Sequence, residues 1–301
     1  MLSVETYDCI VVGDGVAGLS AALTLGRARR RTLILGAGQP RNAGARKMHG
    51  FLSREGIEPR ELLAIARRQL GDYPDVASDE ALVVAIDGGC NAFVVRTKAD
   101  DAYAAKRVLL ATGVSDVLPK IEGIWPLWGT RLFSCPYCDG WEFRDRRIGA
   151  IGPRGEAIGL AREMYRWSHE LIVFATDASE VEPDDRAWFE LHRPPVVDVP
   201  IVRFHEAGND VALELANGER HECAAAFFSA PLQQRSALPA LLGCALGDDG
   251  RILIDADGRT SVPGCFAAGD AANHRHQIVQ AAAGGAAAAM AINEDLIESE
   301  R

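Results

Sequence analysis

Two cysteines separated by two residues are the part of the sequence best suited to redox chemistry. They lie in the segment 134–140, which reads SCPYCDG. The spacing allows Cys135 and Cys138 to form a disulfide, and a helix beginning at this turn would lower the thiol pKa because a helix N-terminus favours the thiolate. Asp139 follows directly and is placed to donate or accept a proton as the disulfide opens. We therefore predict that Cys135, Cys138 and Asp139 are catalytic.

The same pair has two other interpretations, half of a zinc site or two buried structural thiols. A zinc site would need a second Cys or His pair at similar spacing, and the sequence contains none, so we predict no metal site. Seven cysteines, an odd number and mostly scattered, are typical of a reducing cytoplasm rather than of a disulfide framework. We therefore expect the protein to be cytoplasmic.

A glycine-rich turn near the N-terminus predicts dinucleotide binding, the alternative being a plain turn. Residues 7–12 read as a buried strand, and GDGVAG at 13–18 precedes a helical pattern, which is the G-x-G-x-x-G motif in its setting. Gly13 would make the tight turn, Gly15 would admit a pyrophosphate and Gly18 would let the helix pack on the strand. The predicted contacts are Gly13, Gly15, Val16, Ala17 and Gly18.

The second predicted strand lacks the residue that would hold an adenosine ribose. Residues 31–35 read as a strand, and an acidic side chain at its end would bond the ribose. The sequence has Gly36 there, which removes one hydrogen bond and leaves the phosphate site in place. Further on we expect an ordered loop at 40–51, an amphipathic helix at 56–70 and strands at 81–86, 92–97 and 107–110.

Composition and charge restrict the possible partners. The chain has 301 residues, 48% of them hydrophobic, which is enough for one large or two medium domains. Its net charge of −10 argues against nucleic acid or an anionic membrane as a partner. No run approaches the roughly 18 apolar residues of a membrane span, and the first apolar run is a short strand, so we expect neither a membrane segment nor a signal peptide.

Four motifs, in this order along the chain, resemble those of the low-molecular-weight thioredoxin reductases. They are GDGVAG at 13–18, ATG at 111–113, CPYCDG at 135–140 and TSVPGCFAAGD at 260–270. The resemblance extends from end to end. It implies an α/β fold of two Rossmann-like three-layer domains, the second inserted into the first.

The resemblance also implies which domain binds FAD and which carries the redox cysteines. An FAD-binding domain would span 1–116 and 229–301, and an inserted nicotinamide-nucleotide-like domain, 117–228, would carry the redox cysteines. Cys138 would face the flavin and Cys135 would exchange with the substrate. The resemblance to this family also implies that the protein forms a homodimer.

The C-terminal segment supplies the rest of the predicted FAD site. The resemblance assigns Asp270 to the ribityl or phosphate region of FAD, with a helix N-cap as the alternative. A helix from Gln277 through Leu296 begins with small residues, which permit close approach to the flavin or simply close packing on the sheet. The remaining predicted FAD contacts are Arg41, Asn42, Ala111, Thr112, Gly113, Gly269, Asp270, Gln277 and Ile278.

Two histidines precede that helix. His276 stands where the family usually has arginine, and His274 lies two residues earlier. Beside a flavin edge they could act as a base toward an incoming thiol, and on a loop they could equally be solvated and idle. We include His276 among the catalytic candidates.

The inserted domain departs from the resemblance at its nucleotide site. The family pattern at 152–157 is G-x-G-x-x-A, but Arg154 replaces the second glycine and Pro153 removes an amide donor. Asp177 stands where the family has basic residues for the NADP 2′-phosphate, which an aspartate would repel. We therefore expect NAD(P)H to bind poorly, with Gly152, Arg154 and Asp177 marking a degenerate site.

The sequence thus predicts an FAD-dependent thiol–disulfide oxidoreductase that moves two electrons between the flavin, the Cys135–Cys138 pair and an external disulfide or dithiol. The partner would be a thioredoxin-like protein or a small-molecule dithiol or disulfide. Two alternatives use the same parts, a dithiol oxidase with oxygen as acceptor and a ferredoxin-linked reductase. The loop 48–51, the two histidines and the altered nucleotide turn favour the oxidase. A flavin-binding protein without turnover is the non-enzymatic alternative.

Overall fold

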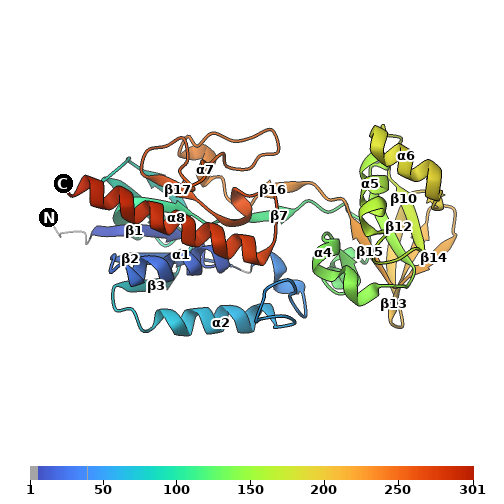
Figure 1. The fold of residues 1–301 in the computed structure, drawn as a ribbon, viewed down its shortest axis with the longest axis horizontal. Coiled ribbons are helices and arrows are strands. Elements are labelled where there is room, and N and C mark those ends of the chain that lie inside the picture. Colours follow the sequence, from blue (N-terminus) through green and yellow to red (C-terminus); the bar gives the residue numbers. More distant parts are fainter. Residues whose placement is uncertain (1–5, 39) are drawn as a thin grey trace. The chain divides into compact units, whose positions relative to one another are not determined.

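The computed structural model describes residues 6–38 and 40–301. Their contacts divide into two compact units (Figure 1): residues 6–43, 51–115 and 232–301 form the first unit, and residues 44–50 and 116–231 form the second. The sequence-based boundaries lie at 116/117 and 228/229 and leave 44–50 in the first domain. That short segment belongs to the second unit because its backbone at Gly44 packs against Gly129.

The first unit is built on a seven-stranded sheet in which six strands follow the order β3-β2-β1-β6-β5-β4. The seventh strand, β17, pairs with residues 108–110 of β6, beyond the residues 102–105 that pair with β5. The parallel strands are β1 (Thr6–Val12), β2 (Thr32–Gly36), β3 (Val76–Glu80), β6 (Ala102–Leu110) and β17 (Cys265–Ala267). The antiparallel strands are β4 (Val83–Asp87) and β5 (Phe93–Thr97). The carboxyl ends of β1, β6 and β17 therefore meet at one edge, where ligands of such sheets bind.

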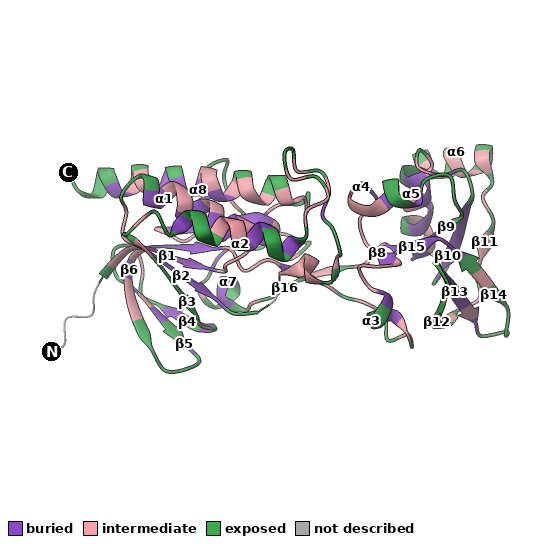
Figure 2. Cartoon of the chain, turned by 90° about the horizontal axis from the view of Figure 1, so that it is seen from below, coloured by how far each residue is buried: buried purple, intermediate pink, exposed green. Residues whose placement is uncertain are grey.

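Both faces of this sheet are covered. Cys9 and Val11 of β1 pack under the helices α1 (Val16–Arg27), α2 (Pro59–Leu70) and α8 (Ile278–Ser299). Ile10 and Val12 point to the opposite face and pack with α7 (Leu238–Leu241) and the loop that follows it. Figure 2 shows these strands as largely buried. The continuous apolar run of β1 is what burial on two faces requires.

Close contacts fix α8 on the sheet and on α1. A side chain at Gly285 of α8 would overlap the backbone carbonyl oxygen of Ala17, so the two helices touch through their backbones. At the other end of α8, the buried Arg107 of β6 forms an ion pair with Asp295 and donates to the Asn91 side-chain oxygen at 2.6 Å. Removing one partner of such a buried pair would leave an uncompensated charge.

The second unit contains a parallel five-stranded sheet in the order β11-β10-β9-β15-β8. Its strands are β8 (Leu132–Phe133), β9 (Ile148–Gly152), β10 (Leu171–Ala175), β11 (Val196–Val197) and β15 (Ala225–Phe228). One face packs on the helices α5 (Arg154–Met164) and α6 (Pro183–His192). The other face packs on an antiparallel sheet of β12 (Ile201–Ala207), β13 (Asp210–Leu215) and β14 (Arg220–Cys223).

The remaining elements are short. The two connections between the units pair as β7 (Val114–Asp116) and β16 (Leu232–Gln234). The second unit also holds α3 (Ile124–Leu127), α4 (Pro136–Asp139) and the 3-10 turn η2 (Gly140–Phe143). The other 3-10 turns are η1 (Arg41–Gly44) and η3 (Gly269–Ala271). Within the described ranges, none of the helices has the length and apolar character needed to span a bilayer.

The observed layers confirm the predicted fold class, an α/β protein with two three-layer Rossmann-like parts. The predicted strand at 81–86 is partly wrong, because residues 81 and 82 form a break between β3 and β4. The antiparallel strands β12 to β14 are absent from the sequence prediction.

Candidate active site

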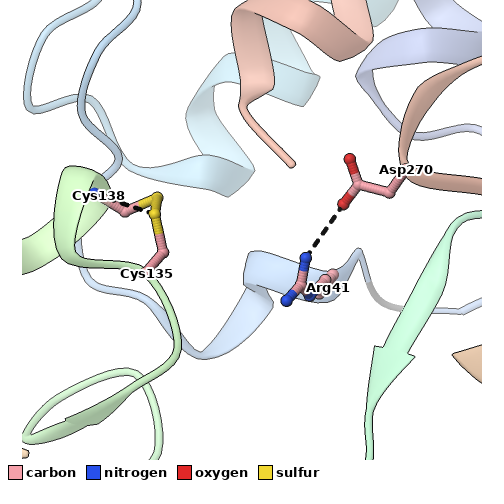
Figure 3. Close-up of a disulfide and its surroundings, with 4 residues drawn as sticks. All are labelled: Arg41, Cys135, Cys138 and Asp270. Carbon is pink, nitrogen blue, oxygen red and sulfur yellow. Dashed lines mark hydrogen bonds and ion pairs between the residues drawn. A yellow bond between two sulfur atoms is a disulfide. The ribbon is translucent and has the colours of Figure 1, made fainter. Parts of the chain in front are cut away.

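The two cysteines of the segment 134–140 form a disulfide in the second unit (Figure 3). Cys135 caps the single turn α4, and Pro136 at its first position needs no amide partner. The backbone N–H of Cys138 donates to the Cys135 sulfur over 3.1 Å. This hydrogen bond would stabilise negative charge on Cys135 when the disulfide opens.

Asp139, the residue after Cys138, has a carboxyl group with a perturbed pKa. Burial, and to a lesser extent the negative charge of Glu142, raises the pKa of Asp139 to about 7, while the nearby His49 opposes that shift. The His49 ring nitrogen Nε2 lies 3.4 Å from Glu142 Oε1. A carboxyl group with a pKa near neutrality can both donate and accept a proton there. Sequence reasoning missed Glu142, although its i,i+3 spacing from Asp139 in a helical turn was a usable signal, while the contact with His49 leaves none.

The glycine-rich turn of the first unit has the geometry of a phosphate cradle. Gly13 has φ of +116°, and a side chain there would overlap the Ala111 carbonyl oxygen. A Cβ at Gly18 would overlap the carbonyl oxygen of Gly13, so helix and turn touch directly. A Cβ at Gly15, in contrast, would meet no atom of the described chain within 4 Å. The contacts show a tight turn at Gly13 and close packing at Gly18, and the role of Gly15 toward a pyrophosphate stays a prediction.

The amino end of α1 is available for an anion. Among the residues that the structure describes, no side chain caps this helix, and its first turn contains no acidic residue. The first amides of the helix therefore point out of its end with the positive pole of the helix dipole. A diphosphate bound there would satisfy them.

The segment 111–113 adds a buried polar atom with no partner. The hydroxyl oxygen of Thr112 is buried and makes no hydrogen bond within the described part of the chain. Gly113 follows with φ of +69°, and a Cβ at Gly113 would meet no described atom within 4 Å. Because a buried hydroxyl without a partner costs about 1–3 kcal/mol, a cofactor group that bonds it would stabilise this strand end. These residues fit a dinucleotide such as FAD.

The end of β2, where the sequence has no acidic residue, lies against the carboxylate of Asp14. A Cβ at Gly36 would overlap the carboxylate of Asp14, the residue between the first two glycines of the motif. Asp14 also pairs with Arg67 of α2, with 2.6 Å between Nη2 and Oδ2. Gly36 is therefore the residue that makes room for Asp14, and a carboxylate still stands at this strand end. Sequence reasoning missed this contact, which joins residues 22 positions apart.

The predicted C-terminal contacts gather in the same unit. Asp270 lies in η3, at the end of β17, and accepts from Arg41 of η1 over 3.5 Å (Figure 3). Gln277 is the N-cap of α8, so Asp270 does not cap that helix. Asn42 lies in η1 and Ile278 is the first residue of α8. His276 is half-buried in the loop between η3 and α8.

Comparison with known proteins decides the family. Residues 7–155 and 197–286 match the family model described as "Pyridine nucleotide-disulphide oxidoreductase". The chain belongs to this family. It is 31% identical over 302 residues to a probable thioredoxin reductase of Arthroderma benhamiae, covering 89% of this chain and 74% of that protein. The family resemblance inferred from the motifs is confirmed, and with it an enzyme of the flavin-dependent disulfide oxidoreductase class.

Two solved structures are similar to nearly the whole chain. An oxidoreductase from Agrobacterium tumefaciens matches with a TM-score of 0.91 and 33% identity, over 97% of this chain and 99% of that one. A putative thioredoxin reductase TrxB from Bacillus anthracis matches with a TM-score of 0.90 and 32% identity, over 98% and 100%. The thioredoxin reductases among the relatives favour the disulfide reductase interpretation over the two alternatives.

The first amides of α5, at the second glycine-containing turn, are hydrogen-bonded within the chain. The N–H of Arg154 donates to Asp177 Oδ1 and the N–H of Gly155 donates to the Ser179 hydroxyl, each over 3.1 Å. A Cβ at Gly155 would overlap the Glu180 carbonyl oxygen. Hydrogen bonds from the backbone of Ser179 and Arg154 lower the pKa of Asp177, which keeps it negative. Two amides at the amino end of α5 are thus already bonded, unlike those of α1.

Arg154 is also engaged through its side chain. Its Nη2 lies 2.5 Å from Asp198 Oδ1. The first turn of α5 carries the acidic Glu156, whose carboxylate accepts from Ser229 over 2.6 Å. Negative charge therefore stands at the helix end that would have to hold a pyrophosphate.

Proposed function

We propose that Cys135 and Cys138 are the redox-active pair through which this enzyme moves two electrons between FAD and an external disulfide or dithiol. The observation that carries this is the disulfide itself, with the Cys138 amide directed at the Cys135 sulfur and Asp139 next in the chain. Cys135 would attack the external disulfide as the thiolate, forming a mixed disulfide that Cys138 then resolves. Asp139 would return a proton to the sulfur released when the internal disulfide opens.

FAD would be held by the first unit. The uncapped amino end of α1 and the open space at Gly15 would take the pyrophosphate, and Thr112 would bond a polar group of the cofactor. Asp14 would hold the adenosine ribose in place of the missing acidic residue at Gly36. Asp270, with Arg41, and the amino end of α8 at Gln277 complete the proposed set. The bound flavin would supply a two-electron donor and acceptor.

We further propose that NADPH is a poor reductant of this enzyme. The two first amides of α5 are bonded by Asp177 and Ser179, and Arg154 is bonded by Asp198. Binding a pyrophosphate there would require breaking these bonds, and each charge-assisted bond lost costs about 1.5–3 kcal/mol.

The external partner would be a thioredoxin-like protein or a small-molecule disulfide or dithiol. The relatives called thioredoxin reductases support the first of these. We propose a homodimer in the cytoplasm, on the family resemblance and on the scattered cysteines.

Single-turnover kinetics tests the proposed pair. The FAD-loaded protein is titrated anaerobically with dithionite until its flavin is fully reduced and is then mixed with a small-molecule disulfide, and flavin absorbance is followed. Cys135→Ser and Cys138→Ser should each lose rapid re-oxidation by the disulfide, whereas the exposed Cys90→Ser should behave like the wild type. Wild-type rates in both redox-segment variants would show that the pair is not catalytic.

A further inference from the structure

A second pair of cysteines lies close together in the first unit. Cys244 is in the loop after α7, and Cys265 is the first residue of β17. Their sulfur atoms are 3.9 Å apart, and the residues are 6% and 1% exposed. The sequence separates them by 20 residues, so their spacing gives no sign of a pair.

The two cysteines of this pair differ in their hydrogen bonds and in the pKa of their thiols. The Cys244 thiol donates to the Thr260 hydroxyl over 3.7 Å, and that hydroxyl donates to the Cys265 carbonyl oxygen over 2.9 Å. The hydrogen bond between the two sulfurs lowers the pKa of Cys244 and raises the pKa of Cys265. Cys244 is therefore the sulfur that more readily becomes the nucleophilic thiolate, and Cys265 remains the thiol beside it.

The two residues also differ in access. Cys244 lies in a loop between the exposed residues Gly243 and Ala245, near Leu241, which is 73% exposed. Cys265 lies within the sheet, paired through β6 with Val108. Of the two cysteines, Cys244 is the one flanked by exposed residues, so it is the side from which we expect a small oxidant to reach the pair.

We propose that Cys244 and Cys265 are a second redox site, a dithiol that a hydroperoxide converts into a disulfide. The Cys244 thiolate attacks a peroxide oxygen, the O–O bond breaks, and a sulfenic acid forms. The hydroxide that leaves takes up the proton that Cys244 lost and becomes water. The Cys265 sulfur then attacks the sulfenic sulfur, the S–S bond forms, the S–O bond breaks, and the second water takes the Cys265 proton. The two thiols lose two electrons and two protons, which reduce hydrogen peroxide to two waters.

The position of the pair gives such a disulfide a structural consequence. β17 leads directly to Gly269 and Asp270, the end of the strand assigned to the cofactor. The disulfide would tie the loop after α7 to the beginning of that strand. It is chemically separate from the Cys135–Cys138 disulfide, so it does not depend on the function proposed for that pair.

Thiol counting and peptide mapping test the proposal on the full-length, FAD-loaded protein. After treatment with hydrogen peroxide and quenching, free thiols are alkylated under denaturing conditions. We expect two fewer than the five free thiols of the untreated protein, and a non-reduced peptide that links Cys244 to Cys265. Dithiothreitol should restore both thiols and remove the linked peptide.

Three variants separate this outcome from its rivals. Cys90→Ser removes an exposed cysteine and should still lose two thiols, whereas Cys244→Ser and Cys265→Ala should each form no linked peptide. The proposal is overturned if the wild type retains all five thiols, links either residue to Cys90, or accumulates sulfinic acid at Cys244 without a disulfide. The wild-type peptide map decides this even if a variant fails to fold.

Discussion

Asp139 illustrates how the surroundings of one residue set its chemistry. The sequence shows that Asp139 follows Cys138 and that Glu142 lies three residues further on. The pKa of Asp139 depends mainly on its burial, which only the fold provides. With the pKa raised to about 7, the carboxyl group retains its proton over a range where an ordinary aspartate is ionised. It can therefore protonate the sulfur that leaves as the disulfide opens.

Replacing Asp139 by asparagine should slow this step. We expect Asp139→Asn to lower the rate of flavin re-oxidation by an external disulfide by about 100-fold or more, since general acid–base catalysis typically contributes that much. For the wild type, the rate should fall as the pH rises through about 7, where the acid loses its proton.

Glu142→Gln is the matched control for that pH dependence. Removing the Glu142 charge should lower the pKa of Asp139 and shift the fall in rate to lower pH, with little loss of rate on the acid side. Stopped-flow profiles of both proteins check this. A Glu142→Gln profile identical to that of the wild type would contradict the role given to Asp139.

Asp14 and Gly36 form the second residue-scale case. Asp14→Ala should weaken FAD binding about 10- to 150-fold, the equivalent of one charge-assisted hydrogen bond of about 1.5–3 kcal/mol. Fluorescence titration of the apoprotein with FAD measures this. The double variant Asp14→Gly/Gly36→Glu moves the carboxylate to the end of β2 and should recover much of the affinity. If Asp14→Ala binds FAD like the wild type, the ribose is held elsewhere.

At the scale of elements, the amino ends of α1 and α5 invite direct comparison. Both follow a parallel strand and a glycine-containing turn, but α1 has no side-chain cap among the described residues, while Asp177 and Ser179 bond the first amides of α5. The altered residues Arg154 and Asp177 were visible in the sequence. The sequence did not show that Asp177 bonds the backbone N–H of Arg154, because that contact depends on the position of the loop after β10.

This contrast predicts slow reduction by nicotinamide nucleotides. In stopped-flow experiments at equal concentrations, NADPH and NADH should both reduce the flavin slowly and without saturation at micromolar levels. Arg154→Ala tests whether this arginine leaves Asp198 and binds a 2′-phosphate. If it does, the variant should slow flavin reduction by NADPH but not by NADH. If it does not, the variant should affect reduction by both nucleotides equally. Rapid, saturable reduction by micromolar NADPH would contradict the proposed closure of this turn.

The elements that the sequence predicted well are those with strong local signals. Residues 7–12 and the following helix were placed to within a few residues because an apolar run and three glycines with separate roles leave little choice. β3, with the sequence VASDE, was missed because it is exposed along most of its length and lacks an apolar pattern. Contacts between distant residues, such as Asp14 with Gly36 or Cys244 with Cys265, leave no local signal at all.

At the scale of the whole molecule, the chain forms two units with separate cores, and the proposed site residues are divided between them. The first unit carries the glycine turn, Thr112 and Asp270, while the second carries the disulfide and Asp139. The segment 44–50 lies between two stretches of the first unit in the sequence but belongs to the second unit in the structure. It carries His49, whose ring lies against Glu142. The resemblance predicted an inserted domain but not this exchange.

The most direct test of the account is the electron capacity of the FAD-loaded protein. Anaerobic titration with dithionite should require about four electrons per FAD for full reduction of the wild type, two for the flavin and two for the Cys135–Cys138 disulfide. The double variant Cys135→Ser/Cys138→Ser should require about two, because only the flavin remains. A wild type that is fully reduced by about two electrons per FAD, with its disulfide intact, would contradict electron exchange between the flavin and this pair.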